Sequence, residues 1–199
     1  MYKRQYQEWK DGEEDWWKDQ QDKAALNPLT GRVVAIGYLN PYAQREDDGS
    51  TLSDHIEIDG LTKYGNHDHE EAQILIRFWS RFTATSFTFG HAVGHNIEGF
   101  DLPFLMKRSW LLGVSISPTV MSGRYFHRCV VDTMKVWTGY VYNEFISLDK
   151  LSKILQVGQK PNYDAKQFAE DWLDGDRETA EFYLKNDLSV THSCYERLY

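Results

Sequence analysis

From Gly31 onward, the sequence alternates between short runs of apolar, β-branched residues and longer stretches in which apolar residues recur every three or four positions. A short, continuous apolar run is typical of a strand buried on both faces, and the longer period is typical of a helix with one buried stripe. Strands that alternate with helices form folds in which helices cover both faces of a sheet. We therefore predict an α/β fold.

Four segments have the composition of strands. The first, RVVAIGYL, follows the turn sequence NPLTG, and the second, HIEID, alternates apolar with acidic residues. The third, SFTFGHAVGHN, has the pattern of a buried strand that runs into a turn, and the fourth is CVVDTMKVW. These segments predict strands at residues 32–39, 55–59, 86–96 and 129–137.

Five segments have helical periodicity, at residues 68–82, 102–113, 147–158, 164–172 and 176–198. Asp68 and Glu71 form a capping-box sequence at the start of the first. Its predicted apolar stripe consists of Ala72, Leu75, Ile76, Trp79 and Phe82. The predicted buried stripe of the last helix consists of Ala180, Leu184, Leu188, Thr191, Tyr195 and Leu198.

Composition limits the size, charge and location of the protein. With 199 residues, of which 41% are hydrophobic, the chain is long enough for one domain with a substantial core. We assign residues 1–23 to an acidic, Trp-bearing lead-in segment and residues 24–199 to the domain. The net charge of −8 excludes a broad basic surface, so nucleic acid would bind only at a local site. Because no run of about 18 apolar residues occurs, we expect a soluble, cytoplasmic protein without membrane contact.

One carboxylate, Asp101, lies in the apolar stretch GHNIEGFDLPFL, residues 94–105. A charge among apolar residues is costly to bury without a partner. Asp101 therefore has two interpretations: it lies at the start of the following helix as a cap, or it holds a cation.

Tyr183 and Asp187 lie four residues apart in the predicted last helix, within EFYLKNDLSV. Residues at this spacing lie one turn apart on the same side of a helix, so a phenol and a carboxylate point in a common direction. Taken alone, they are equally compatible with a half-exposed pair that has no function. Their combination with Asp101, in this order, favours a shared site.

The order of these segments resembles that of the DEDD 3'-5' exonucleases of the ribonuclease H-like fold, in the Tyr-containing subgroup related to the proofreading domain of family B DNA polymerases. HNIEGFDLPFL is similar to the family's second exonuclease motif, an Asn followed by Phe-Asp at the start of a helix. YLKND is similar to the third, Tyr-x-x-x-Asp on the C-terminal helix, and SLDKLSKILQVG lies between them. The resemblance extends from about Ala24 to the C-terminus.

The resemblance implies a mixed sheet flanked by helices and a 3'-5' exonuclease that hydrolyses phosphodiester bonds with two Mg²⁺ or Mn²⁺ ions. The implied substrate is nucleic acid with a free 3' end, which we take to be single-stranded DNA. Asp101 and Asp187 would be the catalytic metal ligands, and Tyr183 would orient the attacking water.

Four further residues are candidates for substrate binding. Phe100 would pack or contact the terminal nucleotide, and Asn96 would bind the substrate or the adjacent backbone. Lys107 and Arg108, beside the implied site, would contact phosphate, unless they form a solvated helix face.

The family's first motif, Asp-x-Glu on a strand, has no credible counterpart here. Carboxylates with this spacing occur at residues 11 and 13, 13 and 15, and 57 and 59. The first two pairs lack an apolar run, and the third follows the first predicted strand. In the fold that the chain resembles, the Asp-x-Glu strand lies in the middle of the sheet. We therefore expect a missing central strand, an incomplete metal site and impaired activity. Either the chain is a fragment with its true start upstream of Met1, which we favour, or water, a shifted strand pairing or another chain fills the gap.

Two alternative functions remain. An exonuclease-like fold without activity would be a module that binds nucleic acid or a partner protein, and the missing first motif favours this reading. A zinc hydrolase is suggested by His67 and His69 together with His55, His91 and His95, but no third ligand has convincing spacing.

Overall fold

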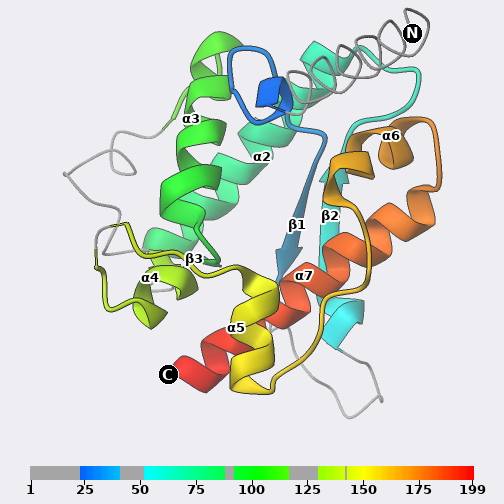
Figure 1. Ribbon diagram of the computed structural model, residues 1–199. Coiled ribbons are helices and arrows are strands. Elements are labelled where there is room, and N and C mark those ends of the chain that lie inside the picture. The colour runs from blue at the N-terminus through cyan, green and yellow to red at the C-terminus, as the bar shows by residue number, and fades with distance from the viewer. Residues whose placement is uncertain (1–22, 41–51, 88–91, 117–129, 142) are drawn as a thin grey trace, which may run out of the picture. The chain divides into compact units, whose positions relative to one another are not determined.

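The computed structural model describes residues 23–40, 52–87, 92–116, 130–141 and 143–199. The chain divides into two compact units, Met1–Arg32 and Val33–Tyr199. The predicted lead-in segment, residues 1–23, lies outside the described residues apart from Lys23. In the second unit, helices mixed with short strands confirm the predicted α/β class (Figure 1).

The described part of the first unit contains a turn at the predicted NPLTG sequence. The carbonyl of Asn27 accepts hydrogen bonds from the N–H groups of Thr30 at 3.0 Å and Gly31 at 2.6 Å. The Thr30 hydroxyl donates to the carbonyl of Ala24 at 2.7 Å. A Cβ atom at Gly31 would lie 2.2 Å from the carbonyl oxygen of Ala25, so a side chain does not fit where this turn closes.

The strands of the second unit form two separate pairs. Strands β1 (Ala35–Leu39) and β2 (Ile56–Gly60) are antiparallel. Strands β3 (Ala92–Gly94) and β4 (Val130–Asp132) are parallel. Among the described residues, the sheet is therefore not the single mixed sheet that the resemblance implied, but two sheets of two strands each.

Two predicted strands are shorter than expected. The fourth was predicted to extend to residue 137, but β4 ends at Asp132 and helix α4 (Thr133–Trp137) follows at once. The chain changes direction here because the Asp132 carboxylate caps the new helix, accepting hydrogen bonds from the N–H groups of Met134 and Lys135. The third was predicted to begin at residue 86, which instead lies in helix α2 (His67–Phe87).

The other helices lie close to their predicted positions. Asn66 accepts a hydrogen bond from the N–H of His69 at the start of α2, and Pro103 lies in the first turn of α3, as predicted. None of the described helices combines the length and apolar character needed to cross a membrane. Their bounds are Leu102–Leu111 for α3, Leu148–Leu155 for α5, Phe168–Leu173 for α6 and Arg177–Leu198 for α7.

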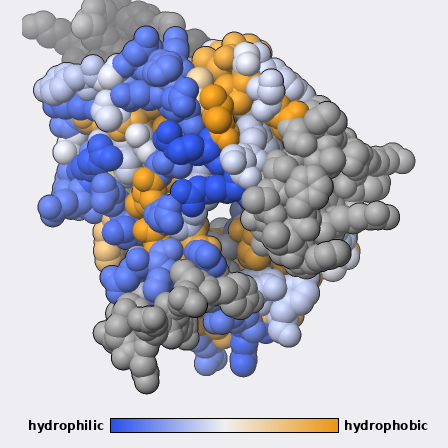
Figure 2. All heavy atoms as spheres, turned by 180° about the vertical axis from the view of Figure 1, so that it is seen from behind, coloured by the Kyte–Doolittle hydropathy of each residue, from blue (hydrophilic) through white to orange (hydrophobic). Residues whose placement is uncertain are grey.

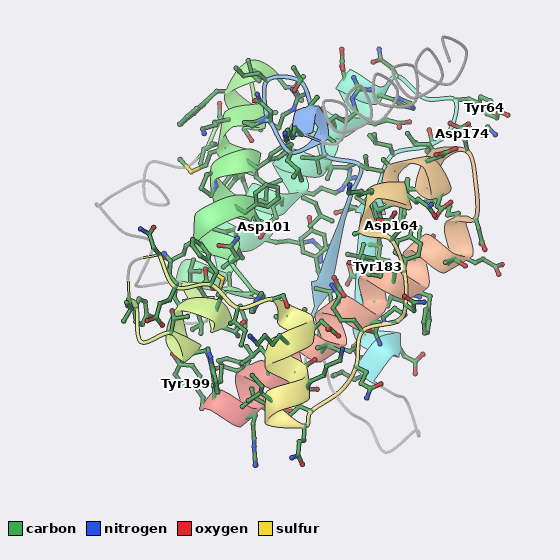
Figure 3. All side chains as sticks on the ribbon, viewed as in Figure 1. Tyr64, Asp101, Asp164, Asp174, Tyr183 and Tyr199 are labelled. Atoms are coloured by element: carbon green, nitrogen blue, oxygen red, sulfur yellow. The ribbon has the colours of Figure 1, made fainter. Side chains whose placement is uncertain are left out.

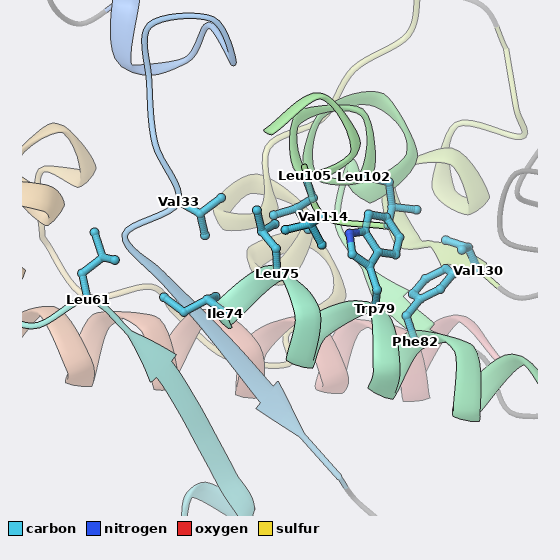
Figure 4. Packing of buried hydrophobic residues seen from close by; sticks show 10 residues of the cluster. All are labelled: Val33, Leu61, Ile74, Leu75, Trp79, Phe82, Leu102, Leu105, Val114 and Val130. Atoms are coloured by element: carbon cyan, nitrogen blue, oxygen red, sulfur yellow. The ribbon is translucent and has the colours of Figure 1, made fainter. Parts of the chain in front are cut away.

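One face of α2 forms the centre of the main hydrophobic core (Figure 4). Leu75 and Trp79 are buried there, as predicted. Ile76 was predicted in the same stripe but is 48% exposed, because the buried face is rotated toward Ile74. The Trp79 indole N–H donates to the hydroxyl of Ser109 on α3 at 2.8 Å, so a hydrogen bond as well as apolar contact joins the two helices.

A second buried cluster joins α5 to α7 and consists of Met134, Ile146, Leu148, Leu151, Val190 and Cys194. The buried residues of α7 are Ala180, Val190 and Cys194, whereas Thr191 and Tyr195, predicted to be buried, are only partly so. The helix contacts β1, β3, α4, α5 and α6. Because its partners lie on more than one side, its buried residues do not follow a single stripe.

A buried ion pair joins α2 to α3 inside the main core. The fully buried carboxylate of Glu71 accepts hydrogen bonds from Nε and Nη2 of Arg108, at 2.8 and 2.7 Å. It also accepts the N–H of Val33 at 2.8 Å. The Glu71 side chain, predicted to close a capping box with Asp68, is thus directed into the core. The predicted phosphate contact Arg108 is correspondingly 8% exposed and bonded to Glu71 instead of facing solvent.

Replacing Glu71 with Gln should lower the free energy of unfolding by about 3 kcal/mol, because the buried guanidinium of Arg108 would lose the carboxylate that accepts two of its hydrogen bonds. Glu181→Gln is the matched control, since its partner Arg177 lies in an exposed pair on α7 at 3.1 Å. That change should lower the free energy by only about 0.3 kcal/mol. Urea denaturation of the two variants measures both values, and equal losses would contradict a dominant role for the buried pair.

Candidate active site

The carboxyl ends of β3 and β4 lie side by side, because the two strands are parallel and Gly94 is opposite Asp132. Asp132 is fully buried, and its carboxylate accepts the N–H groups of Asn96 at 2.9 Å and Glu98 at 3.1 Å. These bonds fix the π-helical turn Ile97–Asp101, which begins after Asn96 in a left-handed backbone conformation with φ 59°. This π-helical turn leads directly into α3 and so places Asp101 at the start of that helix.

The structure does not support the first interpretation of Asp101, as a helix cap. Its side chain makes no capping hydrogen bond to α3. Asp101 lies at the start of α3 (Figure 3) and is exposed to solvent, yet the protein around it desolvates the carboxyl group and, together with the charge of Asp132, raises its pKa to about 6. The second interpretation, in which Asp101 holds a cation, stays a prediction.

Tyr183 and Asp187 on α7 share a lysine partner. The ammonium group of Lys160, in the segment between α5 and α6, donates to the Tyr183 phenol oxygen at 3.0 Å and to Oδ2 of Asp187 at 2.9 Å. Oδ1 of Asp187 is buried and has no hydrogen-bond partner among the described residues. The predicted pair therefore points to a common position, as the spacing of four required, and one carboxylate oxygen is available for a further ligand.

The charges of this group are set by burial and by its own contacts. Burial raises the pKa of Asp187, although the hydrogen bond from Lys160 opposes the rise. Burial by itself lowers the pKa of Lys160, but the bonds to Tyr183 and Asp187 outweigh it and leave the pKa above its usual value. Burial also raises the pKa of Tyr183. At neutral pH, Lys160 is therefore an ammonium ion and Tyr183 a neutral phenol.

Aromatic contacts hold Tyr183 in place. Its ring lies 4.6 Å from the ring of Tyr163 and 6.3 Å from that of Phe168, measured between centroids. The Tyr163 hydroxyl donates a hydrogen bond to Asp171 at 2.7 Å, and this bond fixes the position of Tyr163. The phenol of Tyr183 thus has a defined position before any ligand binds.

His95 connects the end of β3 to two other segments. Its Nδ1 lies 2.9 Å from the hydroxyl of Thr133 on α4, and its Nε2 lies 2.8 Å from the carbonyl of Ile146. The charges of Lys160 and Asp187 both act on the pKa of His95, which desolvation lowers most strongly. The segment that leads to Asp101 therefore passes close to the charged group on α7.

The other candidate residues occupy different environments. Phe100 is 40% exposed, and its ring lies 5.8 Å from that of Phe104. The backbone N–H of Asn96 donates to Asp132, and its side chain lies over Gly99, where a Cβ would be 2.4 Å from Asn96 Oδ1. Neither of its two predicted roles is tested by these contacts. Lys107 is exposed on α3.

Two residues of the site were missed in the sequence. Lys160 follows a glycine and a glutamine after the predicted third helix, and no local pattern connects it with a helix that begins near residue 176. Asp132 carried a usable signal, since a carboxylate that ends an apolar run and precedes a helical segment is a typical cap. That signal was lost because CVVDTMKVW was assigned to one strand.

The carboxylates with Asp-x-Glu spacing and the histidines considered for zinc occupy different environments, and His91 lies outside the described residues. Glu57 and Asp59, the carboxylates with Asp-x-Glu spacing on β2, form ion pairs with Arg81 at 2.6 Å and Arg77 at 2.8 Å. His67 bonds through Nε2 to the carbonyl of Thr62. Within the part of the chain that is described, no three His, Cys, Asp or Glu side chains form a group that could hold a metal.

Comparison with known proteins identifies the family. Residues 29–199 match the sequence model of a family described as a predicted 3'-5' exonuclease related to the exonuclease domain of PolB. The chain belongs to this family. Neither the curated proteins nor the solved structures include a significant match. The predicted relationship to polymerase B exonucleases is confirmed, and exonucleases of this type generally act on nucleic acid with divalent metals.

Replacing Asp101 with Asn should change how stability depends on pH. Because its folded-state pKa of about 6 exceeds the ordinary value of about 4, the folded protein binds a proton between these pH values that the unfolded chain does not. The contribution of Asp101 to the free energy of unfolding of the wild type is therefore greatest below about pH 4, and it is lost as the pH rises through about 6. Relative to wild type, Asp101→Asn should be more stable at pH 7.5 than at pH 4.5, by on the order of 1 kcal/mol after allowance for solvent screening.

Urea denaturation of both proteins at the two pH values measures this difference. A stability difference between variant and wild type that is the same at pH 4.5 and pH 7.5 would show that Asp101 has an ordinary pKa.

Proposed function

We propose that this chain is the core of a metal-dependent 3'-5' exonuclease that acts on single-stranded DNA. The observation that supports this most is the contact of Lys160 with both Tyr183 and Asp187. This contact brings a phenol that forms hydrogen bonds, a carboxylate and an ammonium group to one place, next to the segment that leads to Asp101. These are the groups that the hydrolysis of a phosphodiester requires around the reacting phosphorus.

Asp101 and Asp187 would hold a divalent cation. Asp187 has a buried oxygen without a hydrogen-bond partner among the described residues, and Asp101 is accessible. Mg²⁺ and Mn²⁺ prefer such carboxylate oxygens and often take only one or two of them, together with water and phosphate. When bound, the cation would polarise the phosphate and acidify a coordinated water. Because the described residues contain no larger ligand group, we expect this pair alone to bind metal weakly.

Tyr183 would orient the attacking water as a hydrogen-bond donor. Its phenol oxygen accepts from Lys160, and burial keeps its proton in place at neutral pH, so the O–H group is available to a ligand. A neutral phenol is a poor general base, and the role that fits is positioning of the water. A substitution that removes only the hydroxyl should therefore reduce the rate without disturbing the fold.

Lys160 would neutralise Asp187 until substrate enters. The ammonium group lies within hydrogen-bond distance of both α7 residues, with 21% of its side chain exposed. An arriving phosphate offers this cation a second negative partner, and the long lysine side chain can turn toward it. Lys160 thus compensates charge in the empty site and contacts phosphate in the occupied one.

The substrate end would lie along the start of α3. Phe100 offers a half-exposed ring on which a terminal base can stack, and Lys107 is an exposed cation on the same helix. Arg108 is not part of this proposal, because its guanidinium is bonded to Glu71 in the core.

Mn²⁺ titration tests the metal ligands. In calorimetry, Asp187→Asn should reduce the affinity for Mn²⁺ at least about tenfold, because half of the carboxylate pair is lost. Asp149→Asn, in an exposed pair with Lys153 on α5, is the matched control and should bind like wild type. Equal Mn²⁺ binding by wild type and Asp187→Asn would contradict the assignment.

Hydrolysis of a 5'-labelled, single-stranded DNA oligonucleotide with a free 3' hydroxyl tests the reaction. Any activity should require divalent metal and a free 3' hydroxyl, and it should fall at least about a hundredfold in Tyr183→Phe. Equal degradation of a 3'-blocked oligonucleotide would indicate an endonuclease. Tight DNA binding in excess chelator, without hydrolysis, would favour a non-catalytic binding module, because the carboxylates of an exonuclease site repel phosphate in the absence of metal.

A further inference from the structure

The segment that ends α4 exposes two aromatic rings next to the end of α7. Trp137 is the last residue of α4 and is exposed, and Tyr140 after it is 55% exposed. Tyr199 follows α7 and is 72% exposed, and its ring lies 5.1 Å from that of Tyr195. Helices α4 and α7 are in contact. We call these four residues the aromatic surface. Most of the described surface seen from behind is hydrophilic, with its hydrophobic residues in separate groups (Figure 2), so exposed rings gathered in one place indicate a binding surface.

Tyr140 has an unfavourable backbone conformation that leaves its ring at the surface. Its φ is 60°, and it follows Gly139 with φ 62°. The N–H of Tyr140 donates to the carbonyl of Lys135 at 2.9 Å, and that of Gly139 donates to the carbonyl of Val136 at 3.2 Å. The left-handed conformation is unfavourable for a residue with a Cβ atom, and a ring that is more than half exposed gains little from burial in return. Strain of this kind is typical of positions that contact a ligand.

Tyr140 lies close to the turn that carries Asp101. The pKa of its phenol is raised, first by burial and then by Tyr199, Glu98 and Asp132. Glu98 belongs to the π-helical turn that ends at Asp101, and Asp132 accepts a hydrogen bond from its N–H. The aromatic surface is therefore next to the start of α3, where the end of the proposed substrate would lie.

The acidic groups nearest to Tyr140 are compensated within the protein. The ammonium group of Lys135 lies 2.5 Å from Oε2 of Glu98. The carboxylate of Asp132 accepts four backbone N–H groups. Arg197 adds an exposed cation on the last turn of α7. The repulsion of a phosphate backbone is therefore weaker at this surface than the net charge of −8 alone implies.

We infer that the aromatic surface binds the part of a single-stranded DNA that leads to the active site, by stacking of its bases on the exposed rings. This inference rests on the proposed function, because it assumes that the 3' end of the strand lies at Asp101. A chain with a net charge of −8 has no broad basic surface along which to hold such a strand. Stacking on aromatic rings needs no net charge and accepts every base, since each base has a flat face.

Oligonucleotide binding by the full chain tests the aromatic surface. The probe is a 5'-labelled, twelve-residue oligo-dT with phosphorothioate linkages, which slow hydrolysis, and fluorescence anisotropy in Mn²⁺ measures its affinity. Tyr140→Leu should lower the affinity at least about tenfold, because one stacked base is lost. Tyr140→Phe keeps the ring and should bind like wild type. A trinucleotide, which is long enough only for the site near Asp101, should bind wild type and Tyr140→Leu equally well.

The matched control is Tyr64→Leu. Tyr64 is 90% exposed, with the ammonium group of Lys63 5.5 Å from the centre of its ring. It lies in the segment after β2, at the opposite side of the view from Tyr199 (Figure 3). This variant should bind the twelve-residue oligonucleotide like wild type. Equal affinity of wild type and Tyr140→Leu for that oligonucleotide, or no binding by wild type, would overturn the inference.

Three outcomes separate the aromatic surface from the proposed function. If Tyr140→Leu weakens binding but no chain releases nucleotides from an unmodified oligonucleotide, the aromatic surface stands and the proposed reaction fails. If wild type hydrolyses that oligonucleotide but Tyr140→Leu binds DNA as tightly as wild type, the reaction stands and the aromatic surface is wrong. If light scattering shows that Tyr140→Leu converts a dimer into a monomer while the DNA affinity stays the same, the surface binds a second copy of the chain, and its assignment to DNA is wrong.

Discussion

The position of the candidate site depends on the buried carboxylate of Asp132. This one side chain ends β4, caps α4 through the N–H groups of Met134 and Lys135, and accepts the N–H groups of Asn96 and Glu98. A fully buried carboxylate is stable only if hydrogen bonds replace its hydration, and backbone donors from two segments do so here. The turn that carries the second motif is therefore fixed to the neighbouring strand, and its orientation does not depend on a ligand.

The two carboxylates of the candidate site have different environments. Asp187 is compensated by Lys160, whereas the pKa of Asp101 is raised by desolvation with the charge of Asp132 nearby. An arriving cation would relieve the unfavourable charge on Asp101 and would compete with Lys160 for Asp187. In the proposed mechanism, metal binding would therefore be coupled to release of Lys160, and the released ammonium group would be free to contact a phosphate.

Because the described strands form two separate pairs, the helices must hold these pairs together. Two strand pairs without a common neighbour cannot stabilise one another through backbone hydrogen bonds, so α2 and α7, which contact both pairs, join them. The ion pair of Glu71 with Arg108 then connects α2 to α3, and α3 carries Asp101 at its start.

The sequence by itself determined most of the helices, the α/β class and the spacing of Tyr183 with Asp187, because these follow from periodicities and caps within a few neighbouring residues. Only the tertiary structure placed Lys160 on that pair, since the contact spans more than twenty positions and leaves no local pattern. It also turned Arg108 inward, because a charged side chain on a helix is exposed or buried according to whether a partner such as Glu71 lies opposite it. The packing of distant segments selects partners of this kind, and short-range sequence patterns do not encode which residues they are.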